Sequence, residues 1–333
     1  MKRLFYIATL IIVVASCTKK IEETIPPGNP PSEVPEVNGG PTAWTSLPVP
    51  SGNPLNSPTG TNIIIPVNGT VFCVLGGTVN PTVYKLNTAT TRWELFTSFD
   101  VTVEHSKYLF SHGTKIYWGF FHYSSEHLNS FSCIDVVTGV KTELAPFPGV
   151  FVDGATTFVI GDKGYLLGGY SLDDQTVNQH WEYNFITNQW TNKGNSPLGA
   201  RASASAFVVG NKAYIGFGFT FLYLNGHRIT VYKKDWISYT PGSVFYGIMT
   251  DFPAAGRSGA KGFIIDGLPY VGFGRGTIDN FTDLWRYDIT SNSWTQQTSW
   301  PGTGGVGSIG TFTFNNTGYL VKGGINEFWS YVN

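Results

Sequence analysis

The sequence predicts an all-β fold made of six similar units, and three observations support this. The first is composition: of the 333 residues, 15% are aromatic, only 13% are charged and 40 are glycine, as in a β-rich globular chain with many turns. The second is a repeat of about 50 residues, and the third is one repeat divided between the two ends of the chain. The formal net charge of -1 provides no basic surface, so we expect no nucleic-acid partner.

The repeat is clearest in an aromatic residue that follows a polar turn, as in "YDITSNSW" and "YNFITNQW". Copies of this pattern end at Trp93, Lys141, Trp190, Phe245 and Trp294. An apolar run into a glycine pair precedes most of these endings, for instance "GYLLGG" at 164 to 169. Another strand-like stretch precedes each apolar run, such as "SAFVVGNK" at 205 to 212. Each unit therefore contains four short strands joined by turns.

A four-stranded repeat of about 50 residues is typical of a β-propeller blade. The glycine pair, the aromatic residue before the turn and the closing tryptophan resemble the kelch repeat, over residues 42 to 333. The resemblance implies a six-bladed kelch-type β-propeller. It is weaker in the second unit, where Phe120 and Phe121 replace the glycines, and in the fourth, where Phe245 replaces the tryptophan.

The sixth unit is incomplete at the end of the chain, because "EFWSYVN" supplies its third strand and stops at Asn333. Trp44, in "TAWTSLP", lies one repeat before Trp93, where the closing tryptophan of that unit is expected. We therefore predict that an N-terminal strand closes the last blade, as kelch propellers commonly do, and leaves no open blade face. The remaining repeat tryptophans are interpreted as packing between blades: Trp93, Trp190, Trp285, Trp294 and Trp329.

The first residues have the layout of a secretory signal. Lys2 and Arg3 precede an apolar run from 4 to 15, which is too short for a stable transmembrane anchor. Small residues then precede Cys17 in "VASC", which resembles the lipobox of bacterial lipoproteins. The resemblance implies a signal peptide at 1 to 16, cleavage before Cys17 and lipidation of its thiol.

The segment from Cys17 to residue 41 is rich in Pro, Glu and Gly, and we expect it to form a flexible tether between lipid and propeller. By the same resemblance, Thr18 is not the aspartate typical of inner-membrane retention. We therefore expect a lipid-anchored protein of a bacterial cell envelope, on the periplasmic or surface face of the outer membrane. Cys73 and Cys133 lie in strand-like runs and are interpreted as buried free thiols, with a disulfide as the alternative.

Three groups of residues are candidates for a ligand site on the loops that join successive blades and on the second-to-third-strand loops. Glu104, Arg201 and Arg257 each lie shortly before a blade, at the expected rim of the central opening. The kelch pattern often has arginine here, and two guanidinium groups could bind a carboxylate or a sugar acid. The alternative is that these arginines pair with neighbouring backbone carbonyls or acids.

The second group belongs to an insertion in the fourth unit, "FLYLNGHRITVY" at 221 to 232. It presents Phe221, Tyr223, His227 and Arg228, which could cover the opening and contact a ligand. The alternatives are a solvent-exposed decoration or a strand extension that only packs.

The third group is "HYSSEH" at 122 to 127, with His105 nearby, where imidazoles close to Glu126 could converge on a metal ion. Chance clustering is the preferred interpretation, so we expect no metal and no cofactor. A copper oxidase of galactose resembles this fold, but its Tyr-Cys centre has no counterpart, because Cys73 and Cys133 both lie within strands.

The leading functional hypothesis is a monomeric, membrane-anchored module that binds a glycan or protein ligand through its interblade and second-to-third-strand loops. One alternative is an enzyme resembling the kelch-type sialic acid mutarotases and epimerases, with Glu104, Arg201 and Arg257 as acid, base and charge clamp. Another is a structural subunit of a surface assembly. Fold is weak evidence for choosing among these, and no catalytic constellation is evident in the sequence.

Overall fold

The computed structural model of the chain places one compact unit at Pro41–Asn333. The structure describes residues 43–51, 62–75, 82–88, 90, 92–98, 105–121, 130–150, 152–171, 173–243, 246–278, 280–302, 309–322 and 327–332. These residues form strands and turns, and none of them is in a helix. The predicted signal peptide, Cys17, the tether and Glu104 lie outside the described residues.

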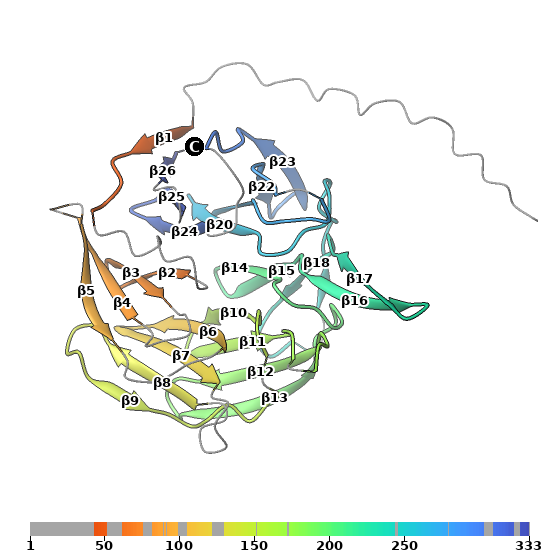
Figure 1. Cartoon of the computed structure of the whole chain (residues 1–333), viewed down its shortest axis with the longest axis horizontal. Helices are drawn as coiled ribbons and strands as arrows, with labels where there is room; N and C mark the ends of the chain where they lie inside the picture. Colours follow the sequence, from red (N-terminus) through yellow and green to blue (C-terminus); the bar gives the residue numbers. More distant parts are fainter. Residues whose placement is uncertain are drawn as a thin grey trace, which may run out of the picture. The chain divides into compact units, whose positions relative to one another are not determined.

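The strands form six antiparallel sheets of four strands each (Figure 1). Blade 1 contains β2 (Asn62–Val67), β3 (Thr70–Leu75), β4 (Thr82–Asn87) and β5 (Arg92–Ser98), and blade 2 contains β6 (His105–His112), β7 (Lys115–Phe121), β8 (Ser130–Asp135) and β9 (Lys141–Glu143). Blade 3 contains β10 (Thr156–Ile160), β11 (Lys163–Leu167), β12 (Gln179–Asn184) and β13 (Gln189–Asn195), and blade 4 contains β14 (Ser205–Val209), β15 (Lys212–Gly216), β18 (Trp236–Tyr239) and β19 (Gly247–Ile248). Blade 5 contains β20 (Lys261–Ile265), β21 (Leu268–Gly272), β22 (Leu284–Asp288) and β23 (Ser293–Gln297), and blade 6 contains β24 (Ile309–Phe314), β25 (Thr317–Lys322), β26 (Glu327–Tyr331) and β1 (Trp44–Leu47).

The first strands of the blades contact one another around a closed ring. β2 contacts β6, β6 contacts β10, β10 contacts β14, β14 contacts β20, β20 contacts β24, and β24 contacts β2 again. Figure 1 shows the blades arranged around this centre. The predicted six-bladed propeller is therefore confirmed.

The predicted closure of the last blade is also confirmed. β1 pairs antiparallel with β26, and Trp44 lies opposite Tyr331. The Trp44 side chain is buried, its ring centroid lies 4.9 Å from that of Tyr331, and its indole nitrogen donates to the Thr298 carbonyl at 2.9 Å. The N-terminal strand thus occupies the outer edge of a sheet made by the end of the chain.

Local sequence determines the tight hairpins within the blades. Among the described residues, four hairpin turns place two successive residues at positive φ, the backbone geometry of a type I′ turn, which suits Asn, Asp and Gly. These turns are Asn68-Gly69, Asn225-Gly226, Asp266-Gly267 and Asn315-Asn316. Because a two-residue turn sets the strand register, it also decides which side chains face the neighbouring blade.

The second glycine of the glycine pair lies after the second strand, where the backbone passes close to the interblade segment before the same blade or the next. Gly218 and Gly274 have φ of 92° and 81°. A Cβ atom on Gly218 would lie 2.7 Å from the Ala202 carbonyl oxygen, and one on Gly274 would lie 2.5 Å from that of Ser258. These glycines therefore serve a close backbone approach.

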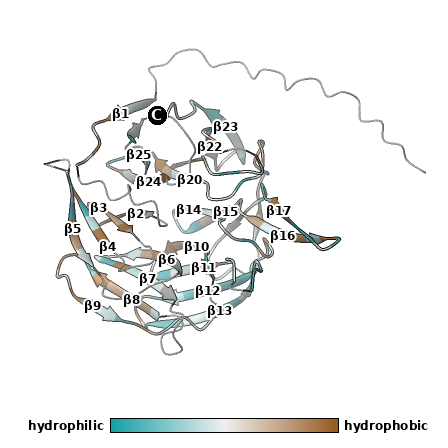
Figure 2. Ribbon diagram, viewed as in Figure 1, coloured by the Kyte–Doolittle hydropathy of each residue, from teal (hydrophilic) through white to brown (hydrophobic). Residues whose placement is uncertain are grey.

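The hydrophobic core lies between blades, and the repeat tryptophans are part of it. Trp93, Trp190, Trp285, Trp294 and Trp329 each pack in or against a cluster formed by two adjacent blades. The closing tryptophans also bind the previous blade: the indole of Trp190 donates to the Ala145 carbonyl at 3.1 Å, and that of Trp294 donates to the Thr250 carbonyl at 3.2 Å. Figure 2 shows hydrophobic residues on inner strands such as β10 and hydrophilic ones on the outer β13.

Both described cysteines are free and buried. Cys73 packs between blades 6 and 1, whereas Cys133 packs between blades 2 and 3. Burial raises the pKa of the Cys73 thiol to about 12, and it also raises the pKa of Cys133. The interpretation as buried free thiols agrees with the structure.

His180 should make the propeller sensitive to mild acid. Its side chain is buried, and its Nδ1 lies 3.0 Å from the Tyr246 hydroxyl. Burial, with a smaller effect of the Lys193 charge, lowers its pKa to about 4. Because the unfolded chain binds the proton near pH 6.5, stability is fully present above that pH and is lost as pH falls towards 4, by roughly 3 kcal/mol in total.

We expect His180→Gln to flatten the dependence of the free energy of unfolding on pH between 6.5 and 4, measured by urea denaturation. Tyr246→Phe is the matched control, since it removes the hydrogen bond but retains the buried imidazole. An equally steep acid loss in the His180→Gln protein would assign the effect to other groups.

Candidate functional site

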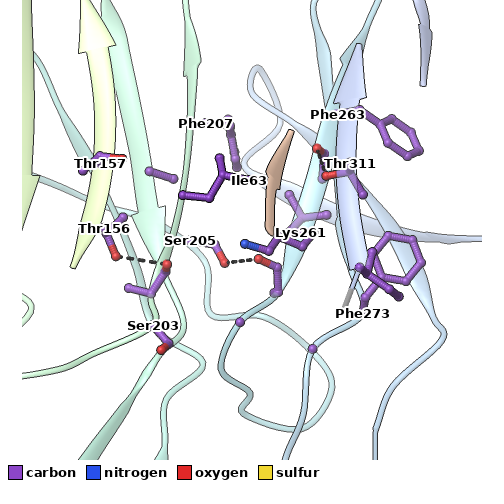
Figure 3. Close-up of a pocket in the computed structure, with 18 of the residues that line it drawn as sticks. Ile63, Thr156, Thr157, Ser203, Ser205, Phe207, Lys261, Phe263, Phe273 and Thr311 are labelled. Atoms are coloured by element: carbon purple, nitrogen blue, oxygen red, sulfur yellow. Dashed lines mark hydrogen bonds between the residues drawn. The ribbon is translucent and has the colours of Figure 1, made fainter. Parts of the chain in front are cut away.

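A cavity of about 650 Å³ lies between the first strands of the blades (Figure 3). Its walls come from the first strands β2, β6, β10, β14, β20 and β24, from the segments that lead into three of them, and from residues of β21. Each first strand is the edge of its sheet, so one side of its backbone has no strand partner. The cavity therefore offers backbone N–H and C=O groups as well as side chains, in the volume range of small-molecule sites.

Hydroxyl side chains of the cavity wall tie adjacent blades together. Thr156 Oγ1 donates to the Ala204 carbonyl at 3.0 Å, and Ser205 Oγ donates to the Ala260 carbonyl at 2.8 Å. Further links run in the opposite direction around the ring: Thr157 to Leu109, Thr311 to Gly262 and Thr313 to Ile264, each to a carbonyl oxygen. These bonds satisfy otherwise unpaired carbonyl groups of the edge strands and hold the wall in place.

The interblade segments form a hydrogen-bonded chain at one end of the cavity. Ser203 N–H donates to the Gly154 carbonyl at 2.7 Å, and Gly259 N–H donates to the Ser203 carbonyl at 2.9 Å. All three residues have positive φ, and Ser203, at 52°, is the one of the three that is not glycine. A serine in this region carries a small strain, and its side chain stands at the cavity wall in Figure 3.

Two charged side chains are among the residues that line the cavity, Asp153 and Lys261. Asp153 is exposed in the segment before β10, and its Oδ1 accepts the N–H of Gly154 at 2.7 Å. Lys261 is the first residue of β20, and Figure 3 shows its ammonium group inside the cavity. No ion pair joins the two among the described contacts, so the cavity wall has one acidic and one basic side chain that are not paired with each other.

Arg201 is committed to partners inside the protein. It is 4% exposed, and its Nη1 and Nη2 atoms donate to Oδ1 and Oδ2 of Asp235 at 2.9 and 2.8 Å. It also donates to the carbonyl groups of Phe217, at 3.1 Å, and Leu198. Burial alone would raise the pKa of Asp235, but the hydrogen bonds and charge of Arg201 outweigh this and lower it.

Arg257 repeats the arrangement in blade 5 and is fully buried. Its Nη2 donates to Asp283 Oδ2 at 2.9 Å, Nη1 donates to the other carboxylate oxygen, and Nη1 also donates to the Phe273 carbonyl at 3.2 Å. Its guanidinium lies 4.1 Å from the Phe281 ring centroid and 4.6 Å from that of Phe252. The two arginines thus have the internal pairing that was the alternative for them, and they present no free fork for a ligand carboxylate.

Sequence reasoning missed the acceptors of this network. A side chain two residues before the third-strand tryptophan accepts its indole N–H: Gln179 from Trp181 at 3.1 Å, Asp283 from Trp285 at 2.8 Å and Glu327 from Trp329 at 2.9 Å. The signal was an acid or amide at this fixed offset in three units. The Asp283 carboxylate also accepts hydrogen bonds from Arg257. One carboxylate therefore joins the interblade segment to the third strand.

The insertion in blade 4 forms a separate hairpin, β16 (Phe219–Leu224) and β17 (His227–Tyr232), which projects from the ring in Figure 1. It contacts the segment between β11 and β12 of blade 3. Arg228 Nη1 lies 3.0 Å from Asp174 Oδ2, and the ring centroids of Phe221 and Tyr170 are 5.6 Å apart. No residue of the hairpin lines the cavity. It is therefore a strand extension beside the opening and does not cover it.

The hairpin presents apolar side chains to solvent. Leu222, Tyr223, Leu224 and Ile229 are 47%, 52%, 56% and 42% exposed, and His227 is also exposed at the tip. Leu222 and Ile229 are cross-strand partners and lie on one face of the hairpin. Of the sequence-predicted ligand residues, Tyr223, His227 and Arg228 therefore lie together, apart from the two buried arginines.

The remaining candidates belong to the first and third groups and are the acidic and histidine residues near blade 2. Glu104 and the segment 122 to 127, with both histidines and Glu126, lie outside the described residues, as does the side chain of His105. Within the described part of the chain, no group of three His, Cys, Asp or Glu residues could hold a metal ion.

Comparison with known proteins agrees with this geometry. No family model matches the chain. A kelch-like protein, terF, of Aspergillus terreus is 27% identical over 170 residues, which cover 48% of this chain and 36% of that protein. The solved structure of YjhT superposes with a TM-score of 0.65 at 16% identity and covers 85% of this chain and 95% of its own.

The fold is that of a kelch-type six-bladed β-propeller. The match with YjhT shows the fold alone, and the fungal match extends over about a third of that protein's length. Within this kelch-type propeller, no helix of the described residues is long and apolar enough to cross a membrane.

Proposed function

We propose that this protein is a lipid-anchored binding module of the bacterial cell envelope that recognises a glycan or protein ligand on one face of its propeller. The face is formed by the interblade segments and the loops between second and third strands. The observation that carries the proposal is that interblade segments line the cavity and that the inserted hairpin of blade 4 belongs to a loop between the second and third strands. Arg201 shows that the two loop classes meet, because it joins an interblade segment to Phe217 and Asp235.

Binding is favoured over catalysis because the two arginines among the candidate catalytic groups are paired inside the protein. Acid-base chemistry on a sugar needs a positioned acid and base, and the mutarotase-like alternative also needs a free arginine clamp. The terminal nitrogens of Arg201 and Arg257 donate to internal acids and carbonyl groups. A kelch propeller with a rigid rim and an open cavity suits recognition without a chemical step.

The membrane part of the proposal rests on Cys17 and the tether. Several acyl chains on one lipidated cysteine would hold the propeller at a membrane, and the segment up to residue 41 would let it turn its loop face towards a ligand. Replacing Cys17 by alanine should move the protein from the membrane to the soluble fraction. A Cys17→Ala protein that stays in the membrane fraction would contradict lipidation as the anchor.

The binding face is tested with surface variants that leave the core intact. Asp153→Arg changes the cavity mouth, Leu222→Ser with Leu224→Ser changes the hairpin, and Ile186→Ser is the matched control. Ile186 is 72% exposed in the turn between β12 and β13, at the opposite end of the blade.

Wild-type and control proteins should bind the same glycans on an array, or the same envelope protein by cross-linking, and at least one face variant should lose that binding. Retention by both face variants would place the ligand elsewhere. Absence of binding to glycans and to envelope proteins by the wild-type protein would instead favour a purely structural subunit.

A further inference from the structure

Lys261 differs from the residues at the corresponding position of the two preceding blades. The residue two positions before the inner phenylalanine is Thr156 in blade 3, Ser205 in blade 4 and Lys261 in blade 5. The hydroxyls of Thr156 and Ser205 each donate to a carbonyl at the start of the next blade. A lysine side chain is too long for that short bond, and Figure 3 shows its ammonium group extending into the cavity.

The ammonium group of Lys261 has no anionic partner among the described residues. No ion pair or side-chain hydrogen bond of Lys261 is present there, although its backbone pairs with β21. An ammonium group has three N–H donors and no acceptor, so it needs oxygen atoms as partners. No described carboxylate lies close enough to the Lys261 ammonium to form an ion pair.

The position of Lys261 makes a bound anion favourable. Its side chain is exposed to the cavity, yet it is surrounded by protein, and this desolvation lowers the pKa of its ammonium group. An opposite charge beside a partly desolvated cation is stabilised more than on an open surface. Asp153 lines the same cavity in the segment before β10, so a ligand with a single anionic group and neutral hydroxyls fits this pair better than a polyanion.

We propose that the central cavity binds a small polar ligand through one oxyanion group, a carboxylate or a phosphate, held by the Lys261 ammonium. This inference rests on the proposed function and adds two details: the ligand carries a negative charge, and Lys261 is the residue that binds it. Asp153 is available to accept hydrogen bonds from the neutral end of the ligand. The ligand should bind less tightly as pH rises through the lowered pKa of Lys261.

The first experiment does not depend on knowing the natural ligand. Reductive ¹³C-methylation of the full-length protein makes each lysine visible by NMR, and the signal absent from Lys261→Arg identifies Lys261. Sodium acetate and sodium phosphate are the probes, with sodium chloride at equal ionic strength. The Lys261 signal should shift saturably with at least one probe, whereas a response equal to that of the surface lysines would overturn the proposal.

The second experiment separates the anion site from glycan recognition. The probes are glucuronate, glucose 6-phosphate and glucose, which share a ring and differ in charge, and binding is measured by calorimetry. A charged probe should bind at least about tenfold more tightly than glucose. Lys261→Met should remove that advantage and Lys261→Arg should retain it.

Lys212→Met is the matched control, because Lys212 is exposed beside the turn between β14 and β15. Saturable acetate or phosphate binding without sugar binding would support the anion site and count against a small glycan ligand. Equal binding of all three sugars, unchanged by Lys261→Met, would support glycan recognition and overturn the anion site. The anion site would also be overturned if the Lys212→Met protein lost the tighter binding of charged probes to the same extent as the Lys261→Met protein.

Discussion

Arg257→Met is expected to lower the free energy of unfolding by about 3–5 kcal/mol, because it leaves a partly buried carboxylate without its cation. Arg257 is fully buried, and both terminal nitrogens bind Asp283. Methionine retains the aliphatic volume but supplies no donor for Asp283 or for the Phe273 carbonyl. Urea denaturation followed by tryptophan fluorescence measures the change. Arg228→Met breaks the exposed pair with Asp174 and should cost at most about 1 kcal/mol.

A second substitution distinguishes loss of the ion pair from loss of packing. Asp283→Asn in the Arg257→Met background removes the unpaired charge and keeps an oxygen for the indole N–H of Trp285. The double variant should recover about 1 kcal/mol or more. A single variant as stable as the wild-type protein would show that this network contributes little.

Trp44→Ala should also destabilise the propeller by about 3–5 kcal/mol, the usual range for a large aromatic residue removed from a core. The Trp44 ring packs against Tyr331 and Phe263, and its indole nitrogen bonds the Thr298 carbonyl. Loss of this side chain weakens the contact between β1 and the rest of blade 6. Thermal denaturation gives the change, with Thr45→Ala on the exposed side of β1 as the control.

The outcome is clearest in comparison with an internal tryptophan. If closure matters beyond packing, Trp44→Ala should increase proteolysis near residues 44 to 47 more than Trp294→Ala does. Equal stability of the Trp44→Ala and Thr45→Ala proteins would contradict a closing role for β1.

Features that repeat along the chain were predictable from sequence. Spacing alone located Trp44, since an aromatic residue that packs between blades recurs at the same position in most blades. The insertion around Tyr223 was equally visible as a departure from the period. The direction in which this hairpin projects could not be predicted, because it depends on contacts with Tyr170 and Asp174 of the neighbouring blade.

The partners of the rim arginines could not be predicted in the same way. Asp235 lies 34 residues after Arg201, and Asp283 lies 26 residues after Arg257. The intervals differ because the blade-4 hairpin falls inside the first of them. Lys261 was overlooked for a related reason: without the fold, nothing distinguishes a lysine at the start of an inner strand from one on the surface.

The pairing of β1 with β26 also constrains the order of events during folding. The bond from Trp44 to Thr298 joins residues 254 positions apart, and β1 pairs with β26, so the ring can close only after β26 has been synthesised. Blades 1 to 5 each contain strands that are contiguous in sequence and can form earlier. Until β26 is available, β1 has no strand partner and the incomplete sixth sheet exposes an open edge. The interval before closure is thus when the newly made protein is most open to proteases and to mispairing with another chain.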